Sequence, residues 1–344
     1  MLSPGKKPQR TIFLTGASGV IGQAMIKKMD ARSVICLVRQ TPVSHADAVT
    51  VQGDISLPRF GLSSERWKDL AGRTDCVVHS AAVTDFHKPD DKVMQANVNS
   101  LHNIFELAAA AKAPLYHFST AFVRPTKTAS TNEELAYAVS KREGERMVRE
   151  SGLPHVIVRP SIVIGDSASG AIARFQGFHN VLGGVLTGAL PIVPASRAAF
   201  IDCVPQDVVA DTVLALIDEA KMGGEHWITA GDNALTTTRI CEILDKFATG
   251  RGGSFTTPRF VPPDMVERLL RPVFLPALPI ALQKRFARLH KISAYLLIEE
   301  RFPSSLPELT ARFALPPLPD LETAVLRGLD HWANATGFLK RAAA

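Results

Sequence analysis

Cysteine is scarce in this sequence and is never paired at short spacing. The 344 residues contain four cysteines, and no two of them form a CxxC motif. The ligand spacing of a zinc site is absent, so no metal site is predicted. A chain of this length can bury a sizeable core without disulfides. We expect free thiols in a reducing, cytoplasmic environment at Cys36, Cys76, Cys203 and Cys241.

Long, uninterrupted apolar runs are missing as well. Residues 1–10 are polar and basic without an apolar stretch, which predicts no signal peptide. The longest uncharged stretch, residues 175–196, is interrupted by glycine and proline. It therefore makes a poor transmembrane helix, and we interpret it as an apolar wall for a substrate.

A strong excess of one charge is also absent. The sequence carries 39 basic and 33 acidic residues, for a formal net charge of +6. This mild balance predicts a slightly basic surface and argues against nucleic-acid binding. It is compatible with a phosphorylated cofactor or a phosphopantetheine carrier.

Short apolar runs alternate with segments of helical pattern in the first half of the chain. Such alternation predicts βαβ units, and right-handed crossovers then give a doubly wound parallel Rossmann sheet of the α/β class. The expected strands are residues 11–15, 33–38, 48–52, 76–79, 115–119 and 155–158. The expected helices are residues 20–29, 63–70, 91–111 and 134–151.

The regular alternation loosens after Gly165. We predict an NADP-binding Rossmann core over residues 1–165 and a smaller, mostly helical substrate-binding part over residues 166–344. About residues 200–230 should return to the core, because a strand, a helix and another strand, residues 225–229, recur there. A further helix is expected over residues 237–247, after a threonine N-cap signal.

A glycine turn follows the first predicted strand, in TIFLTGASGVIG over residues 11–22. Gly16 permits the tight turn, Gly19 lets the backbone approach a pyrophosphate, and Gly22 allows close packing of helix on sheet. The N–H groups of the first helical turn then hold phosphates. Cofactor contacts are predicted at Gly16, Ser18, Gly19, Val20, Ile21 and Gly22.

The end of the second predicted strand lacks an acidic residue. An acid there would bind the ribose 2′-hydroxyl of NAD. The sequence instead reads Cys-Leu-Val-Arg and ends at Arg39, whose guanidinium can pair with a 2′-phosphate and stack on adenine. The alternative is a solvated surface arginine. We predict NADP(H) as the cofactor.

The YAVSK motif places Tyr137 and Lys141 one turn apart on a helix face. An ammonium beside a phenol should lower the tyrosine pKa. Tyr137 can then exchange a proton with a substrate oxygen while hydride moves to or from nicotinamide. The alternative, an exposed helix pair, is disfavoured by its place after the fifth strand of a dinucleotide fold.

Two hydroxyl side chains, Ser119 and Thr120, follow the fifth predicted strand. One of them can hydrogen-bond the substrate carbonyl and support a developing oxyanion. We assign that catalytic role to Thr120. Ser119 is left as a cofactor contact or as a strand-end hydroxyl that satisfies backbone.

Taken together, these motifs resemble the extended short-chain dehydrogenase/reductases over roughly residues 10–250. The resemblance rests on TGASGVIG, the GDI step after the third strand, HSAA after the fourth, an asparagine on the next helix, YAVSK, and RPS. It implies adenine contacts after the third strand, a cofactor-lining segment after the fourth, and a segment beside the nicotinamide after the YAVSK helix and its strand. The corresponding residues are Asp54, Ile55, Ser80, Ala81, Ala82, Asn97, Pro160, Ser161 and Ile162.

Three segments resemble one branch of that family, the thioester reductases and fatty acyl-CoA reductases. They are AAVTDF over residues 81–86, FSTAF over residues 118–122, and VRPSIVIGD over residues 158–166. Members of the branch use NADPH to reduce an acyl thioester to an aldehyde or alcohol. The resemblance implies a hydrophobic acyl group on coenzyme A or on an acyl carrier protein.

Other activities stay open at this point. The first is a ketone or alcohol oxidoreductase similar to the hydroxysteroid and 3-ketoacid branches. A sugar-nucleotide epimerase or dehydratase needs a diphosphate site, for which Arg174 and Arg197 are the available cations, and dehydratases add an acid where Ala121 and Phe122 stand. A non-catalytic NADP-binding regulator is disfavoured by the intact threonine, tyrosine and lysine.

Residues 266–298 mix leucine, phenylalanine and proline with basic side chains. They form either an amphipathic lid against an acyl chain or membrane surface, or short helices packed on the core. We favour the second interpretation, and peripheral membrane contact and oligomeric state stay open. The basic residues concerned are Arg268, Arg271, Lys284, Arg285, Arg288 and Lys291.

Overall fold

The structure is a computed structural model. It describes residues 10–29, 34–40, 43, 48–84, 90–124, 136–220, 223–262 and 296–338, with scattered positions between 265 and 292. The chain divides into two compact units. The first draws on Met1–Val123, Ala136–Arg159 and Val209–His226, and the second on Arg124–Leu135, Pro160–Val208 and Trp227–Ala344.

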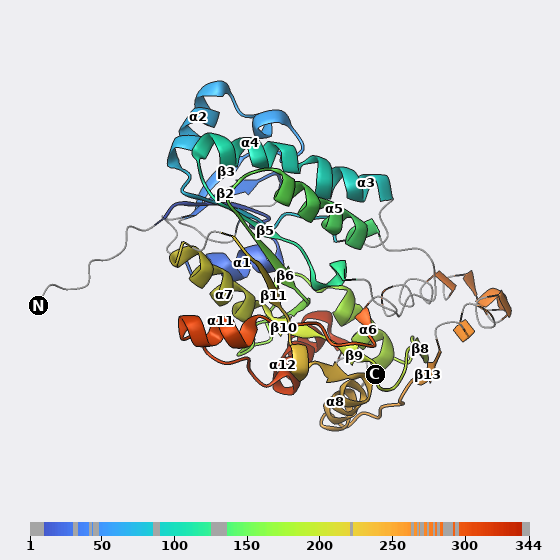
Figure 1. The fold of residues 1–344 in the computed structure, drawn as a ribbon. Helices are drawn as coiled ribbons and strands as arrows, with labels where there is room; N and C mark the ends of the chain where they lie inside the picture. Colours follow the sequence, from blue (N-terminus) through green and yellow to red (C-terminus); the bar gives the residue numbers. More distant parts are fainter. Residues whose placement is uncertain are drawn as a thin grey trace, which may run out of the picture. The chain divides into compact units, whose positions relative to one another are not determined.

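A seven-stranded sheet with the strand order β3-β2-β1-β4-β5-β6-β11 organises the first unit (Figure 1). Every pair from β3 to β6 is parallel, and the order reverses between β1 and β4. The predicted α/β doubly wound Rossmann sheet is confirmed. Its strands are β1 (Ile12–Thr15), β2 (Val34–Val38), β3 (Val49–Gln52), β4 (Cys76–His79), β5 (Leu115–Phe118), β6 (His155–Pro160) and β11 (Glu225–Ile228).

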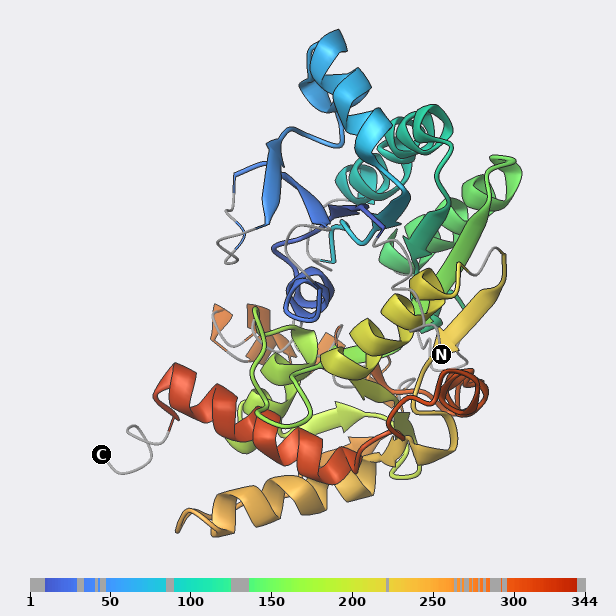
Figure 2. The same ribbon diagram turned by 90° about the vertical axis from the view of Figure 1, so that its left-hand side faces the viewer.

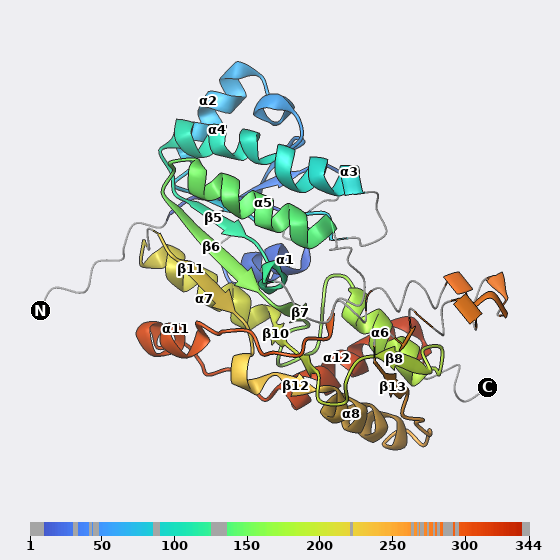
Figure 3. The same cartoon turned by 45° about the vertical axis from the view of Figure 1, so that its right-hand side comes forward.

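Helices cover both faces of this sheet (Figures 1 and 3). One face carries α2 (Ser64–Arg73), α3 (Asp90–Met94), η3 (Gln95–Asn99), α4 (Leu101–Ala111) and α5 (Ala136–Glu150). The other carries α1 (Val20–Ile26) and α7 (Gln206–Asp218). Two short 3-10 turns, η2 (Pro58–Gly61) and η4 (Ala121–Val123), lie in the connections of this unit.

The helix predicted over residues 91–111 is present, but one turn of it is wider than an α-helix. Residues Gln95–Asn99 form a π-helical turn between α3 and α4. The buried positions in this region are Val93, Asn97, Val98, Ser100 and Leu101.

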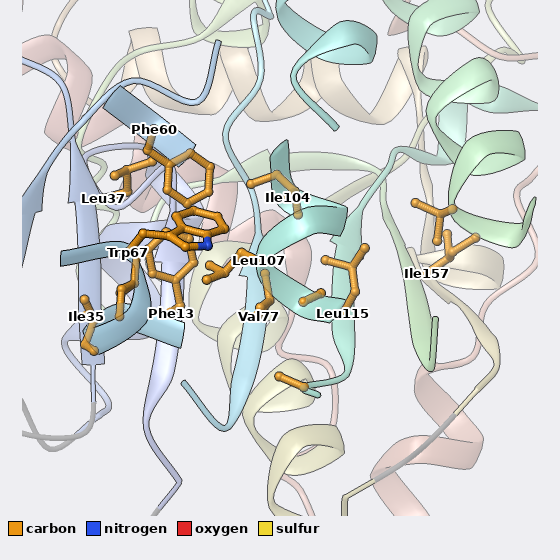
Figure 4. Close-up of a cluster of buried hydrophobic side chains, with 14 residues drawn as sticks. Phe13, Ile35, Leu37, Phe60, Trp67, Val77, Ile104, Leu107, Leu115 and Ile157 are labelled. Atoms are coloured by element: carbon orange, nitrogen blue, oxygen red, sulfur yellow. The ribbon is translucent and has the colours of Figure 1, made fainter. Parts of the chain in front are cut away.

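The main apolar core lies between the sheet and the helices α2, α4 and α5 (Figure 4). Phe13 of β1 stacks on Phe60 at a centroid distance of 5.5 Å, and Phe60 meets the Trp67 ring edge-on at 5.3 Å. Fully burying each such side chain stabilises the fold by roughly 1.5–3 kcal/mol. This core fixes the strands whose carboxyl ends carry the candidate site.

The second unit combines helices with three small pairs of strands. The pairs join β7 (Ile162–Ile164) to β10 (Cys203–Pro205), β8 (Ile192–Pro194) to β13 (Arg259–Val261), and β9 (Phe200–Ile201) to β12 (Leu235–Thr236). Its helices are α6 (Gly177–Leu186), α8 (Thr237–Thr249), α11 (Leu306–Phe313) and α12 (Leu321–Thr336), with the turns η5 (Gly231–Asn233) and η7 (Leu275–Ala277).

Helices α8 and α12 run side by side in this unit (Figure 2). Arg239 of α8 forms an ion pair with Glu322 of α12. The helix predicted over residues 237–247 is confirmed, and the Thr236 hydroxyl caps it by accepting the N–H of Arg239 at 3.1 Å.

Several predicted features lie outside the described residues. They include Ser33, the Asp85-Phe86 part of the AAVTDF segment, the start of the predicted helix at residues 134–135, and most of residues 266–298. Within the part of the chain that is described, no helix is both long and apolar enough to cross a bilayer.

Candidate active site

The glycine turn after β1 is built so that no larger residue fits at two of its positions. Gly16 has a φ of +73°, and a Cβ there would stand 2.6 Å from the backbone nitrogen of Ala81. A Cβ on Gly22 would stand 2.3 Å from the Gly16 carbonyl oxygen. The N–H of Gly19 donates to that same oxygen at 2.9 Å. The turn is therefore tight and pressed against the loop after β4.

That loop is tied to the end of β1 by side chains as well as backbone. The Ser80 hydroxyl donates to the Thr15 carbonyl at 2.8 Å, and the N–H of Ala81 donates to the Thr15 hydroxyl at 3.3 Å. The predicted cofactor-lining residues of the HSAA segment thus lie beside the glycine turn. The family pattern gave their position, whereas the role of Thr15 as their anchor was not predicted.

The Asn97 side chain joins this loop to helix α5 through hydrogen bonds. Its side-chain oxygen accepts the N–H of Val83 at 2.7 Å, and its amide group donates to the Val83 carbonyl at 3.1 Å and to the Ser140 hydroxyl at 3.0 Å. The residue is buried. Its assignment as a cofactor contact stays a prediction, while its contacts within the protein hold the loop and α5 together.

The ends of β2 and β3 bring Arg39 and Asp54 together. Arg39 is largely exposed, with Nη1 3.7 Å from Oδ2 of Asp54. The Asp54 carboxylate accepts the N–H and the hydroxyl of Ser56, and these bonds, followed by the Arg39 charge, lower its pKa. Ile55 packs on the apolar core. The sequence supplied both charged residues but not their proximity, which depends on the pairing of β2 with β3.

Tyr137 and Thr120 are joined by a hydrogen bond between their side chains. Thr120 directly precedes the η4 turn, and Tyr137 lies in the first turn of α5. Burial raises the Tyr137 pKa to about 12, although the bond from Thr120 acts in the opposite direction. We expected an ammonium to lower this pKa. That expectation was wrong for the structure described here, because desolvation dominates.

Lys141 lies one turn after the half-buried Tyr137 and is itself buried. Its Nζ donates to the backbone carbonyl of Phe118 at 2.7 Å, which fixes the ammonium at the end of β5. Burial lowers the Lys141 pKa to about 8, and the nearby Glu145 carboxylate opposes that shift. The structure therefore groups Thr120, Tyr137 and Lys141 at the end of one strand.

Ser119, the other predicted hydroxyl, is buried in the same place. Its N–H donates to the Val158 carbonyl at 2.8 Å. Its hydroxyl has no hydrogen-bond partner among the described residues. A buried hydroxyl without a partner is unusual in a folded protein, so this atom is a candidate contact for a bound molecule.

Two histidines on neighbouring strands lie close to Lys141. The rings of His79 and His117 stack with their centroids 5.6 Å apart. Burial, followed by the charge of Lys141, lowers the His79 pKa to about 3 and holds the His117 pKa well below its usual range. His117 was not singled out from the sequence. It precedes Phe118 on β5, so the two side chains point to opposite faces of the sheet, and His117 lies on the face covered by α5.

A cluster of four charges, of which Glu145 and Arg159 are buried, follows one turn further along α5. Arg159 binds Glu145 through Nε at 2.7 Å and through Nη2 at 2.6 Å, and it also contacts Glu225 at 2.5 Å. Arg149 contacts Glu145 at 2.7 Å and Glu225 at 2.6 Å. The cluster joins α5, β6 and β11. In the sequence, Arg159 counted only as part of the family-like RPS motif.

The remaining predicted cofactor residues, Pro160, Ser161 and Ile162, belong to the second unit. The N–H of Ser161 donates to the Ile228 carbonyl at 3.1 Å and the N–H of Ile162 to the Asp202 carbonyl at 3.2 Å, while the Ser161 hydroxyl has no partner among the described residues. Burial raises the Asp202 pKa. These contacts order the segment within its own unit, and the cofactor role of the three residues stays a prediction.

The sequence matches one family model and parts of several much longer proteins. A family model for NAD-binding domains, described as male sterility protein, matches residues 44–213. The hybrid PKS-NRPS synthetase gkaA of Penicillium citrinum is 28% identical over 271 residues, which cover 70% of this chain. The same match covers 7% of the synthetase, so the chain corresponds to a small part of that protein's length.

Solved structures share the fold along almost the whole chain. The terminal R domain from the myxalamid PKS-NRPS biosynthetic pathway has a TM-score of 0.76 at 22% identity, covering 97% of this chain and 92% of that one. A UDP-glucuronic acid 4-epimerase from Bacillus cereus, in complex with NAD, has a TM-score of 0.64 at 17% identity, covering 94% and 99%. At these identities the likeness shows the fold alone.

Proposed function

This chain belongs to the extended short-chain dehydrogenase/reductases of the thioester-reductase type, and we propose that it reduces a hydrophobic acyl thioester with hydride from NADPH. The family makes it an NAD(P)-dependent oxidoreductase. The finer proposal names the acyl group as carried on coenzyme A or an acyl carrier protein. The observation that carries carbonyl reduction is the Thr120–Tyr137 hydrogen bond beside the buried ammonium of Lys141, and the likeness to PKS-NRPS proteins supports a thioester as the carbonyl.

The first unit offers a site that fits a nicotinamide dinucleotide. A Cβ at Gly16 or Gly22 would meet protein atoms, so these glycines make the turn before helix α1 tight, as a pyrophosphate-binding loop at a helix N-terminus requires. The buried Ser119 hydroxyl has no partner among the described residues and can serve one on a bound cofactor. The bound cofactor would supply hydride.

Individual cofactor contacts follow the predicted assignments. We propose that the glycine turn holds the pyrophosphate and that Arg39 pairs with a 2′-phosphate, since its guanidinium is largely exposed. Within the same proposal, residues 1–165 hold the cofactor and residues 166–344 supply the substrate site. The further proposed contacts are Ser18, Val20, Ile21, Asp54, Ile55, Ser80, Ala81, Ala82, Asn97, Tyr137, Lys141, Pro160, Ser161 and Ile162.

The protonation states in the site suit reduction of a carbonyl. A Tyr137 pKa raised to about 12 keeps the phenol protonated at neutral pH, so it can donate a proton to the substrate oxygen. Thr120 supplies a second hydroxyl for that oxygen. The Lys141 ammonium stabilises the phenolate that forms when Tyr137 releases its proton.

Product analysis tests this proposal directly. NADPH oxidation is measured with acyl-CoAs and carrier-bound acyl groups, with aldehydes and with bulky ketones. The balanced reaction consumes one thioester, one NADPH and one proton, and it releases one aldehyde, one free thiol and NADP⁺. Equal amounts of thiol and oxidised cofactor support the proposal. Turnover of ketones alone, without thiol release, would select the ketone oxidoreductase in its place.

A further inference from the structure

The inner face of helix α5 carries three functional groups at regular spacing. Tyr137, Lys141 and Glu145 follow one another at intervals of four residues, which places neighbouring pairs on one side of a helix. Lys141 and Glu145 are 4% and 3% exposed. An ammonium and a carboxylate therefore lie one turn apart, away from water.

A buried ammonium is costly unless a negative charge compensates it. The Phe118 carbonyl that accepts from Lys141 is neutral. The other groups facing Lys141 are His79 on β4, His117 on β5 and Tyr137 on α5, and each is uncharged near neutral pH because of its shifted pKa. On α3, which also packs against α5, the charged Asp90, Asp91 and Lys92 are exposed. Among these described groups, Glu145 supplies the buried negative charge.

Two arginines, Arg159 on β6 and Arg149 on α5, bind the Glu145 carboxylate. Arg159 binds both of its oxygens, at 2.7 and 2.6 Å, in the bidentate arrangement that orients carboxylates most strongly. Arg149 adds a third bond at 2.7 Å. Glu145 and Glu225 together balance the two arginines, so the cluster is neutral overall and the Glu145 carboxylate is fixed in place.

We propose that Glu145 is a positioning residue for Lys141, whose ammonium it keeps charged and next to Tyr137. The inference rests on the catalytic roles proposed above for Tyr137 and Lys141. Glu145 itself acts through Lys141 and contacts neither substrate nor cofactor in this scheme. Its partners Arg159 and Arg149 hold it in that position.

The consequence of this arrangement is a defined alkaline limit to activity. The Lys141 pKa of about 8 lies close to neutral pH, and the Glu145 charge opposes a further decrease. Without that carboxylate the ammonium loses its proton at lower pH. Activity that depends on charged Lys141 is then lost earlier as pH rises.

The test compares Glu145→Gln with Glu225→Gln in the full chain, using the carbonyl substrate with the highest turnover. Both variants remove a carboxylate from the same cluster, but only the first removes the charge next to Lys141. In Glu145→Gln the alkaline limb of the kcat/KM profile should move down by about one pH unit. In Glu225→Gln it should stay in place even where thermal stability falls. An unmoved limb in the first variant, or equal movement in both, would overturn the proposal.

Direct titration of Lys141 separates this inference from the proposed reaction. NMR of lysine side chains labelled with ¹³C gives the pKa of Lys141 without substrate, and the Lys141→Arg variant assigns its signal. A lower pKa in Glu145→Gln than in wild type supports the positioning role even where thioester reduction fails. The same pKa in both proteins refutes it.

A charge-preserving variant covers the case in which Glu145→Gln does not fold. Glu145→Asp keeps the carboxylate on a shorter side chain, so it should keep the alkaline limb within a few tenths of a unit of wild type. A limb that moves down by about a unit in Glu145→Asp, with the fold intact by circular dichroism, contradicts the proposal.

Discussion

Lys141 donates a hydrogen bond to the backbone carbonyl of Phe118 at 2.7 Å, which ties helix α5 to the end of strand β5. Two residues further along the chain from Phe118 is Thr120, the hydrogen-bond partner of Tyr137. This lysine thus contributes, with the bond from Arg142 to the Val123 carbonyl, to fixing the helix that carries Tyr137 on the strand end that carries Thr120. The first prediction concerns the proton that this group handles.

Replacing Tyr137 with Phe should lower kcat/KM by roughly 10²–10⁴-fold, because it removes the proposed proton donor while keeping the ring. Steady-state NADPH oxidation measures the loss, and titration calorimetry checks that the cofactor still binds. Tyr116→Phe is the matched control. It removes a buried phenol whose hydroxyl donates to the Leu216 carbonyl at 3.2 Å, so it should reduce stability and leave turnover unchanged. Wild-type turnover in Tyr137→Phe would exclude the assignment.

Replacing Gly16 with Ala should weaken both NADPH binding and folding. The added Cβ would stand 2.6 Å from the Ala81 nitrogen, at a φ of +73° that alanine adopts poorly. We expect the free energy of unfolding to fall by at least about 1 kcal/mol. Gly72→Ala is the control, since a Cβ there meets nothing within 4 Å and alanine favours helix α2. Equal affinities for NADPH in the two variants would contradict the role of the turn.

Cofactor preference tests Arg39. If its exposed guanidinium pairs with a 2′-phosphate, Arg39→Ala should lose about 10- to 100-fold in NADPH affinity and little in NADH affinity, as expected for a charge-assisted bond. Calorimetric titration with both dinucleotides measures the difference. Arg66→Ala, which removes another surface arginine, serves as the control. Equal binding of NADPH and NADH by the wild-type protein would remove the proposed role.

The stacked histidines predict a loss of stability in mild acid. In the folded chain the pKa values of His79 and His117 lie below their ordinary value of 6.5, so below that pH the unfolded chain binds more protons. The stabilisation is complete above about pH 6.5 and is lost as pH falls toward the folded values. Each group costs up to about 1.4 kcal/mol per pH unit in that window.

Urea denaturation at pH 7.5 and pH 5.5 measures this effect. His117→Phe, which keeps a ring in the same place, should flatten the dependence of unfolding free energy on pH. His102→Gln replaces an exposed histidine and should leave the dependence as in wild type. The same pH dependence in all three proteins would mean that the buried pair does not titrate on unfolding.

Features that depend on a few adjacent residues were predictable from the sequence. The glycine turn, the alternation of strands and helices, and the spacing of Tyr137 and Lys141 are all local, and the parallel sheet follows from the alternation. Gly16 shows the limit of this reasoning. Its turn was predicted, but its contact with Ala81 follows from the pairing of β1 with β4.

Features that depend on distant residues were not predictable in this way. The bond from Asn97 to Ser140 spans 43 positions, and the contact of Arg159 with Glu225 spans 66. The direction of the Tyr137 pKa shift was missed for a related reason. Helical spacing identifies a neighbouring ammonium, but the burial that raises the Tyr137 pKa is a property of the assembled unit.

The π-helical turn at Gln95–Asn99 sets the rotational phase of the helices on either side of it. Removing one residue from this turn would restore an ordinary α-helix and rotate the preceding segment by about 100° relative to α4. Asn97 would then turn away from Val83 and Ser140, while Leu101 and Ile104 kept their places in the core. A one-residue deletion in this turn would therefore release the loop beside the glycine turn and displace Val93, while the packing of Leu101 and Ile104 was kept.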